Sequence, residues 1–343
     1  MVLAVSNTSG FSCLPLPLTA RNGASVLRIV LKAGFAIAAD GRTLPLDEQP
    51  EIVMEDQYWG DPGVSSIRYE SDVVLEKPLT DLVVVGQAHA PRGQAVKTLD
   101  VTLAYQRNIL KRLHVTGDRM WRRGAFGWTM SEPQFFTAMP LRYDRAYGGT
   151  DEEGSEARNR SGTGYASKFD KRFEGRPCPN VEFPDQLIAS VSNRPAPAGF
   201  GVVSKHWQPR LAFAGTYDDA WLDRQFPLLP LDFDSRFFQS VAADQWIARP
   251  HGGEQIVVTG MSPDGPLGVT LPPCDVKIGL HYRASSEEKL MDLDTVMLEP
   301  DERRLTLTWR ATADIHGDPF NLLEMVIGAR KELVFADCGC EVT

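Results

Sequence analysis

Alternation of apolar and polar residues is the feature of this sequence that most restricts its fold. In VLRIVLKAGFAI (residues 26–37), apolar side chains occupy every second position, and Arg28 and Lys32 fall between them. A period of two is typical of a strand with one face in the core and the other toward solvent. RRLTLTWRA (303–311) repeats the pattern, with Arg310 on the outward face. We therefore predict two half-buried strands.

Further stretches extend the strand pattern. DLVVVGQA (81–88) is apolar almost throughout, which predicts a strand covered on both faces. KTLDVTLAY (97–105) alternates, and NILKRLHVTGDRMW (108–121) is its expected antiparallel neighbour after a short turn. Strands that recur at short intervals are typical of all-β folds. We predict a mainly β fold with antiparallel, sandwich-like or barrel-like sheets, long loops and few short helices.

Three segments have helical signals. SRFFQSVAADQW (235–246) is long enough for two turns. Ser285 and Glu288 have the spacing at which the two side chains cap the start of a helix. FNLLEMVIGARKEL (320–333) carries apolar residues at the spacing of one helical face. We predict an amphipathic C-terminal helix over this last stretch.

The stretch 150–182 separates the strand-rich parts of the chain. It is polar, rich in glycine and without apolar period, so it is either a linker or a long surface loop. The expected division of the chain is an N-terminal extension, a β-rich domain divisible into two lobes around this stretch, and a helical tail: 1–23, 24–312 (lobes 24–150 and 183–312) and 313–343.

Charge and motifs exclude several classes of function. The formal net charge of -9 disfavours nucleic acid and anionic membranes as partners. The basic cluster between Arg107 and Arg123 is expected on the solvated face of a hairpin. Zinc-binding histidine spacings, a nucleophile elbow and a phosphate-binding loop are all absent from the sequence. We therefore assign no catalytic residue, metal ligand or cofactor, although a triad assembled from distant residues stays open.

The cysteines and the first residues indicate a compartment. Five widely spaced cysteines are an odd number, which fits a reducing environment better than a disulfide framework. The chain has no basic residue before Arg21 and no apolar stretch of about 20 residues, as a membrane span requires. We expect a cytoplasmic protein that does not enter membranes.

The stretch AGTYDDAW (214–221) suggests an active site at first sight. Neighbouring residues on a strand point to opposite faces, so Asp218 and Asp219 would not share a substrate. Asp232 closely follows Pro227 and Pro230 and is expected in a loop. Aspartates at turns commonly accept hydrogen bonds from backbone N–H groups. We predict that these aspartates stabilise turns and do not catalyse a reaction.

Turn motifs that combine glycine, aspartate and an arginine or aromatic residue recur along the chain, as in GDPG, GDR, YGG and GTYD. We predict ion pairs of Arg68 with Asp72, of Asp118 with Arg119 and of Arg145 with a nearby aspartate. The tryptophans fit either a sugar-binding platform or buried indoles. We expect the working surface on loop 150–182 and near Trp207 and Trp221. The candidate structural or partner-binding residues are Trp59, Asp61, Arg68, Asp72, Asp118, Arg119, Trp121, Arg145, Tyr147, Trp207, Arg210, Tyr217, Asp218, Trp221 and Asp232.

The order of short motifs is more specific than any one of them. The chain runs through YWGDPG (58–63), LHVTGDRMW (113–121), MPLRYDRAYGGTD (139–151), HWQPRLAFAGTYDDAW (206–221) and GGEQIVVTG (252–260). As an ordered set these motifs resemble domain-of-unknown-function family 2169, over about residues 24–312.

This resemblance implies an accessory protein of a bacterial type VI secretion system. Members are thought to act as adaptors or chaperones that help to load an effector onto the spike. The implied partners are a secreted effector, a PAAR-like tip or a spike protein, and no catalytic residue is implied. The alternative is a carbohydrate-active or carbohydrate-binding β-sandwich that uses tryptophan and aspartate. The oligomeric state is left open.

Overall fold

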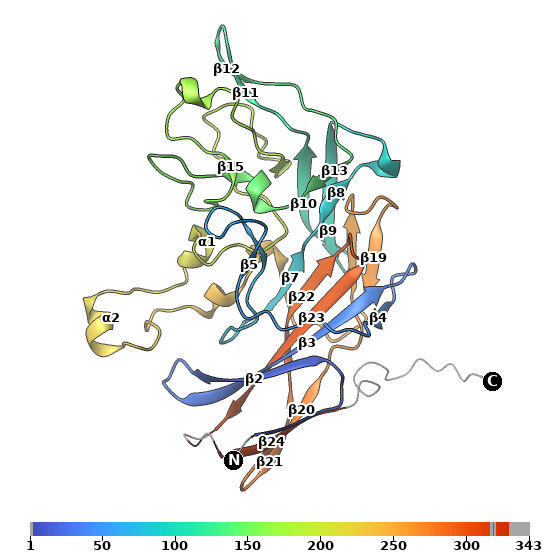
Figure 1. Cartoon of the computed structure of the whole chain (residues 1–343), viewed down its shortest axis with the longest axis vertical. Helices are drawn as coiled ribbons and strands as arrows, with labels where there is room; N and C mark the ends of the chain where they lie inside the picture. The colour runs from blue at the N-terminus through green and yellow to red at the C-terminus, as the bar shows by residue number, and fades with distance from the viewer. Residues whose placement is uncertain (1–2, 316–317, 319, 329–343) are drawn as a thin grey trace, which may run out of the picture.

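A computed structural model describes residues 3–315, 318 and 320–328. The protein is mainly β, as predicted, and the described helices are short. Figure 1 shows the sheets in the lower and middle parts of the molecule, loops and small ribbons at the top (residues 117–200, which we call the crown), and an arm that carries α2 to one side. The helices are α1 (Gln208–Leu211), α2 (Asp219–Arg224) and the 3₁₀ segments Pro91–Gly93, Tyr143–Arg145, Lys171–Phe173, Ser235–Phe238 and Ala243–Gln245.

Three open sheets build the body, and most of their strand pairs are antiparallel. The seven-stranded sheet contains β17 (Trp246–Ile247), β7 (Thr80–Val84), β22 (Asp292–Glu299), β23 (Arg304–Asp314), β3 (Ser25–Ile37), β2 (Ser12–Thr19) and β4 (Thr43–Pro45). The five-stranded sheet contains β16 (Val181–Glu182), β10 (Asn108–Thr116), β9 (Thr98–Tyr105), β18 (Gln255–Thr259) and β19 (Leu267–Thr270). The four-stranded sheet contains β1 (Ala4–Asn7), β24 (Leu322–Ile327), β20 (Lys277–Tyr282) and β21 (Ser286–Leu290).

Two strand pairs of the three large sheets, β7 with β22 and β1 with β24, are parallel. Four two-stranded ribbons lie outside these sheets. The ribbons are β5 (Gln57–Tyr58) with β6 (Ile67–Tyr69), β8 (Gln87–His89) with β13 (Ala138–Pro140), β11 (Trp121–Gly124) with β12 (Gly127–Met130), and β14 (Tyr147–Gly148) with β15 (Thr163–Gly164).

One hydrophobic core joins the three sheets. Leu31 and Trp309 from the seven-stranded sheet, Leu103 from the five-stranded sheet and Leu280 from the four-stranded sheet belong to the same cluster. Strands from residues 24–150 and 183–312 alternate within single sheets, so the two-lobe division is wrong. Residues 4–19, expected in an extension, form β1 and β2 and pair with β24 and β3.

The expectation of half-buried strands is also wrong for β3 and β23. Lys32, Thr308 and Arg310 lie on the face predicted to be solvated, yet all three are buried. Lys32 pairs with Asp72 (Nζ–Oδ2 2.7 Å), and the Arg310 guanidinium pairs with the carboxylate of Asp294. Asp72 belongs to a loop that covers this face, so the polar side chains are satisfied inside the protein instead of by water.

Two helix predictions fail. Residues 286–290 and 292–299 form β21 and β22, so the capping spacing of Ser285 and Glu288 does not start a helix. In the predicted C-terminal helix, Leu322–Ile327 form β24 between β1 and β20. Pairing on both edges satisfies the backbone there and overrides a local helical pattern. Residues 329–333 of that prediction lie outside the described residues.

The stretch 150–182 is a packed surface loop and not a linker. Phe173 and Cys178 lie with Trp121 and Tyr147 in a small core of the crown, separate from the core of the sheets. The glycines of the YGG motif make this packing possible. Gly148 has a positive φ of 155°, and a Cβ there would lie 2.2 Å from the carbonyl oxygen of Asn159.

Candidate functional site

A cleft of about 550 Å³ lies where the β5–β6 hairpin meets the crown; we call it the Trp59 cleft. Its walls come from segments that are distant in the sequence. Among the residues that line it are Trp59, Asp118, Arg119, Arg142, Asp144 and Arg145. Four of these six belong to the sequence candidates, so the fold brings part of the predicted set together.

Two guanidinium groups lie over the indole ring of Trp59. The Cζ atom of Arg68 is 4.6 Å from the ring centroid and that of Arg142 is 4.9 Å from it. Such cation–π contacts orient an arginine without neutralising its charge. The Nε atoms of both arginines are buried and have no hydrogen-bond partner in the part of the chain that the structure describes.

The ion pairs at the rim differ from those predicted. Arg145 pairs with Asp118 (Nη1–Oδ1 3.0 Å), which confirms one expectation. Arg119 pairs with the buried Glu182 (Nη2–Oε2 2.7 Å), so the predicted Asp118–Arg119 pair is wrong. The two residues are neighbours on an irregular segment and point to different partners. Asn180 also donates to Asp118 (Nδ2–Oδ1 3.0 Å).

Asp144 links the hairpin loop to the crown. Its carboxylate accepts hydrogen bonds from the backbone N–H (3.1 Å) and the hydroxyl of Ser66. In the same loop, the backbone carbonyl of Asp61 accepts from the N–H groups of Val64 (3.3 Å) and Ser65 (3.1 Å). Asp61 therefore closes its turn through its main chain.

The other candidates on the body are structural. Asp72 pairs with Lys32 and not with Arg68, so that predicted pair is wrong. Arg210 is buried, pairs with Glu70 and donates through Nε to the Phe237 carbonyl (2.9 Å). In this way Arg210 fixes α1 to the end of the β5–β6 hairpin and to the 3₁₀ segment Ser235–Phe238.

Three aromatic candidates are also structural. Trp207 is buried against Tyr143, with their ring centroids 5.5 Å apart. Trp121 and Tyr147 lie in the core of the crown. Trp207 therefore forms no exposed edge, contrary to the expectation for this region.

Asp218 of the AGTYDDAW motif and Asp232 stabilise turns, as predicted. Asp218 caps α2 by accepting from the N–H of Trp221 (2.8 Å). Asp232 accepts from the N–H (3.0 Å) and hydroxyl (2.8 Å) of Thr216, which keep the pKa of its carboxyl below its ordinary value. We define residues 214–233 as the arm. Asp232 lies at its base and Asp218 lies near its tip, at the start of α2. Gly215 is required here, because a Cβ on it would lie 2.9 Å from Oδ1 of Asp232.

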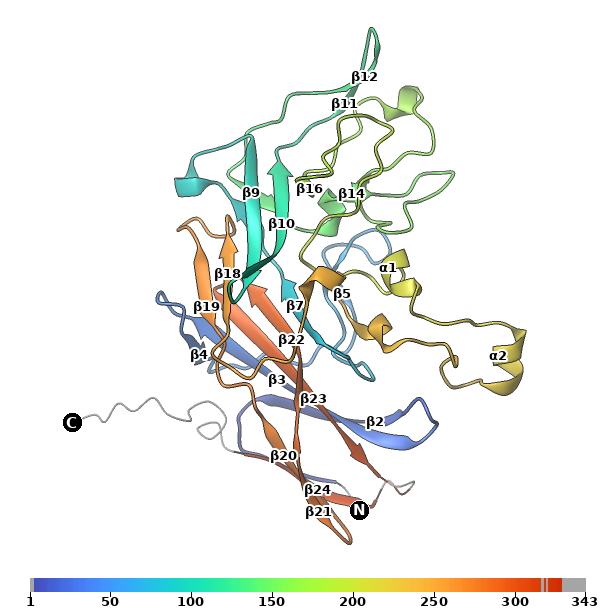
Figure 2. The same ribbon diagram turned by 180° about the vertical axis from the view of Figure 1, so that it is seen from behind.

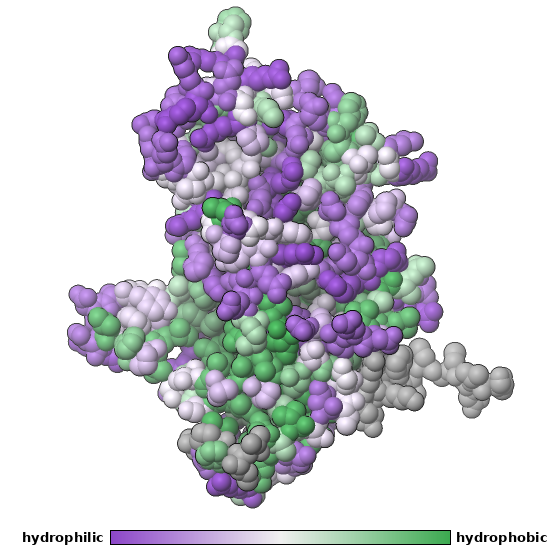
Figure 3. Space-filling model, viewed as in Figure 1, coloured by the Kyte–Doolittle hydropathy of each residue, from purple (hydrophilic) through white to green (hydrophobic). Residues whose placement is uncertain are grey.

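The arm exposes apolar side chains, which the sequence reasoning missed. The exposed fractions are 54% for Tyr217, 57% for Leu222, 62% for Phe226 and 86% for Leu231. Trp221 packs edge-on between Tyr217 and Phe226 and donates through Nε1 to the carbonyl of Leu228 (2.9 Å). Figures 1 and 2 agree that α2 projects away from the sheets, and Figure 3 shows apolar residues on the arm among hydrophilic ones.

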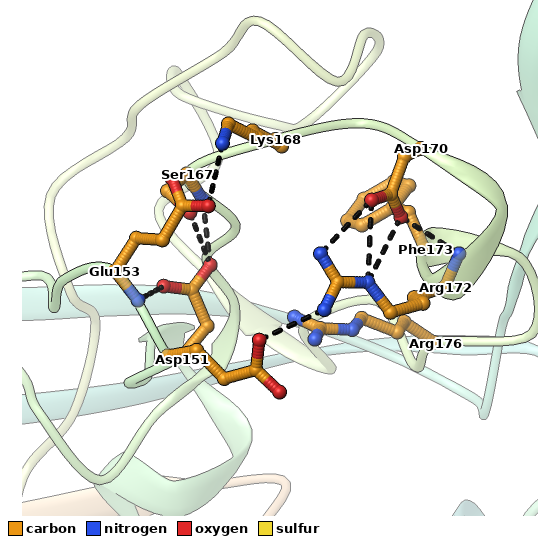
Figure 4. A pocket seen from close by; sticks show the side chains of 9 residues that line it. Asp151, Glu153, Ser167, Lys168, Asp170, Arg172, Phe173 and Arg176 are labelled. Atoms are coloured by element: carbon orange, nitrogen blue, oxygen red, sulfur yellow. Dashed lines mark hydrogen bonds and ion pairs between the residues drawn. The ribbon is translucent and has the colours of Figure 1, made fainter.

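A second pocket, of about 160 Å³, lies in loop 150–182 and is shown in Figure 4. Hydrogen bonds from Ser167 and from the N–H groups of Glu153 and Gly154 lower the pKa of Asp151 to about 2. Lys168 pairs with Glu153 (2.6 Å), and Arg172 pairs with Glu152 and Asp170. These charged side chains pair with one another and not with a free ligand. Together with the hydrogen bonds of Asp151 they join the turn at 151–154 to the segment 167–172, and we call this set of contacts the latch.

The described residues contain neither a grouped set of metal ligands nor a membrane-spanning helix. Within them no three His, Cys, Asp or Glu residues are grouped to hold a metal ion. No helix there is long and apolar enough to cross a membrane. Cys13, Cys178 and Cys274 are free, and burial raises the pKa of Cys13 to about 11 and that of Cys178 to about 12. The remaining two cysteines, at 338 and 340, lie outside the described residues.

Sequence reasoning missed Arg142 and Asp144 as cleft residues. Both lie in the quoted motif MPLRYDRAYGGTD, so the signal was present, but nothing local distinguishes them from other turn residues.

Comparisons with known proteins give one match. Neither a curated protein nor a solved structure matches the chain. A family model described as "Uncharacterized protein conserved in bacteria (DUF2169)" matches residues 22–310, which include the cleft, the arm and most strands of the three sheets. The chain therefore belongs to this bacterial family of uncharacterised proteins.

Proposed function

We propose that the protein is a binding adaptor of a type VI secretion system, which holds a secreted effector or a PAAR-like tip and helps to load it onto the spike. The secretion context comes from the resemblance of the motif series described above. The exposed apolar side chains of the arm carry the binding role. Leu222, Phe226 and Leu231 are in solvent, although burying such a side chain is worth about 1.5–3 kcal/mol. Exposed apolar groups that gather on one element are typical of protein-binding surfaces.

The shape of the arm fits this role. Hydrogen bonds at Asp218 and Asp232 hold its turns, and a bond from Arg21 to the carbonyl of Phe233 (Nη2–O 2.7 Å) fixes its base. A preorganised element loses less conformational entropy on binding than a mobile loop. The arm can therefore present its apolar side chains to a groove on a partner at low entropic cost.

The alternative, a carbohydrate site, is favoured by one observation. Trp59 lies in a cleft with Asp118 and Asp144, the residue types that bind sugars. Against it, guanidinium groups lie over the indole, and each carboxylate already accepts hydrogen bonds from the protein. The adaptor is therefore the better supported proposal.

The test is a capture experiment with the effector or PAAR-like protein encoded beside this gene. The double variant Leu222→Ser, Leu231→Ser removes the two exposed leucines of the arm. We expect capture to fall at least about tenfold, which corresponds to about 1.4 kcal/mol, while the melting temperature stays unchanged. Ile109→Ser, Phe135→Ser is the matched control, because Ile109 and Phe135 are 57% and 67% exposed elsewhere. Equal capture by both double variants would contradict the proposal.

A gene deletion tests the secretion context separately. Without this protein, the level of the cognate effector or its attachment to the spike should fall, while the sheath still assembles. Unchanged effector level, spike loading and secretion would rule out the adaptor role.

A further inference from the structure

Two arginines beside Trp59 differ from the others that we have described on the body and crown. Arg119, Arg145 and Arg210 each pair with a carboxylate. For Arg68 and Arg142 the described residues provide contacts with aromatic rings and no ion pair. Buried polar groups are almost always hydrogen-bonded, but Arg119 also leaves its Nε without a partner. The missing carboxylate, and not the buried Nε, therefore distinguishes Arg68 and Arg142.

Of the two, Arg142 is the one that lines the Trp59 cleft. Its backbone is fixed, because the 3₁₀ segment Tyr143–Arg145 begins directly after it and Tyr143 is buried. Its side chain is held against the indole of Trp59. The guanidinium of Arg142 is therefore positioned in the cleft before any ligand arrives.

Arg142 differs from the other arginines that line the cleft in having no carboxylate partner among the described residues. Three arginines (119, 142 and 145) and two aspartates (118 and 144) line it. Arg145 pairs with Asp118 at the rim, and Arg119 pairs with Glu182. Asp144 accepts hydrogen bonds from Ser66 and keeps its negative charge. With Glu182 included the charges sum to zero, so the cleft is distinguished by the unpaired guanidinium of Arg142 and not by a net charge.

We propose that the Trp59 cleft binds a carboxylate side chain on an acidic segment of a protein partner. A guanidinium presents parallel N–H donors that match the two oxygens of a carboxylate. Asp118 and Asp144 repel ligands with several negative charges, so a single carboxylate fits better than a phosphate or a polyanion. The cleft volume of about 550 Å³ accommodates a few side chains, within the roughly 300–1,000 Å³ usual for ligand sites. Exposed Met120 adds an apolar contact on its wall.

This proposal rests on the proposed function in one respect, namely that the ligand is a segment of a protein. The cleft and the arm are built from different parts of the chain, so each can be removed alone. The Leu222→Ser, Leu231→Ser variant should bind an acidic peptide normally. If that variant also captures the neighbouring gene's product normally, the adaptor proposal fails and the cleft proposal stands.

The experiment uses phage-displayed random peptides selected on the immobilised full chain and counter-selected on Arg142→Gln. The enriched peptides are then synthesised with a fluorophore, together with versions in which Glu and Asp become Gln and Asn. We expect an essential carboxylate in the enriched peptides. Its amide version should bind at least about tenfold more weakly, as the loss of a charge-assisted hydrogen bond predicts.

Arg142→Gln should weaken binding of the acidic peptide by the same factor, and should weaken the amide peptide no further. Arg142→Lys keeps the charge but not the forked donor geometry, so it should restore only part of the affinity. Arg122→Gln is the matched control, because Arg122 is exposed on β11 away from the cleft lining, and it should bind as the wild type does.

Three results would overturn the proposal. The first is a selection in which no peptide distinguishes the wild type from Arg142→Gln. The second is equal affinity for acidic and amide peptides. The third is displacement of the peptide by millimolar inorganic phosphate, which would indicate an anion site of a different kind.

Discussion

In the seven-stranded sheet, lysine, arginine and aspartate lie in the interior, whereas on the arm leucine and phenylalanine lie in solvent. Asp81 on β7 is buried and pairs with Lys77 of the preceding loop at 2.6 Å. The arm has Leu231 at 86% exposure. The sheet buries charged side chains because neighbouring loops supply an oppositely charged partner for them. The arm projects from the sheets, so no other segment covers its exposed leucines. Coverage by distant segments, more than residue type, decides what is buried here.

The largest expected effect comes from breaking a buried pair in the sheet. Asp81 accepts from Lys77 (2.6 Å), Gln239 (2.6 Å) and the N–H of Ser240 (2.7 Å). Asp81→Ala leaves the Lys77 ammonium buried without its counter-charge, so the free energy of unfolding should fall by about 3–5 kcal/mol. Urea denaturation measures it.

Asp219→Ala, on the exposed face of α2, is the control and should change stability little. Lys77 also donates to the hydroxyls of Ser240 (3.2 Å) and Thr295 (3.1 Å). A loss below about 1 kcal/mol for Asp81→Ala, within the range of surface substitutions and weak pairs, would mean that these hydroxyls alone satisfy Lys77. The contrast between sheet and arm would then be much weaker.

A smaller effect is expected at the cap of α2. Asp218→Ala removes the acceptor of the Trp221 N–H and should cost the arm about 1 kcal/mol, whereas Asp218→Asn retains a good cap and should cost little. Hydrogen exchange at the Trp221 amide reports this local change. Equal protection in all three proteins would show that the cap does not order the arm.

The smallest effect concerns the latch of loop 150–182. The pKa of Asp151 is lowered from 3.8 to about 2, so its contribution to stability is present above about pH 4 and is lost as pH falls through 2. Because this carboxylate is exposed, the effect should be local. The protection factor of the Ser167 amide, its exchange rate relative to the intrinsic rate at the same pH, should fall below pH 4 in the wild type and be low at all pH values in Asp151→Ala. A pH-independent protection factor for Ser167 in the wild type would contradict this.

The strands were predictable because a period of two is a local property. The predicted hairpin of residues 97–105 and 108–121 corresponds to β9 and β10, which pair from Asn108–Tyr105 to Thr116–Thr98. The continuous apolar run at 81–88 contains β7, which is buried throughout. Each pattern indicates a strand from the local sequence alone. The expectation that the basic cluster lies on a solvated face is wrong for Lys111 of β10, which is buried and pairs with Asp244 (2.8 Å).

What failed depends on residues far away. Arg310 was placed in solvent because its partners Asp72 and Asp294 are not its neighbours in sequence. The C-terminal stretch was predicted helical because its partners β1 and β20 come from elsewhere. The cleft shows the same limit: Trp59 and Arg145 were singled out, but only the fold reveals Arg142 beside the indole.

The pairing of β3 with β23 has a consequence for how the chain is made. Arg28 on β3 donates to Thr312 on β23, 284 residues further along. Translation adds about 5–20 residues per second, so roughly a quarter of a minute to a minute passes between the synthesis of β3 and that of β23. During that time its apolar edge is unpaired, and contacts of such long range also close slowly. The nascent chain therefore exposes an unpaired strand edge, the kind of surface that templates aggregation, for most of its synthesis.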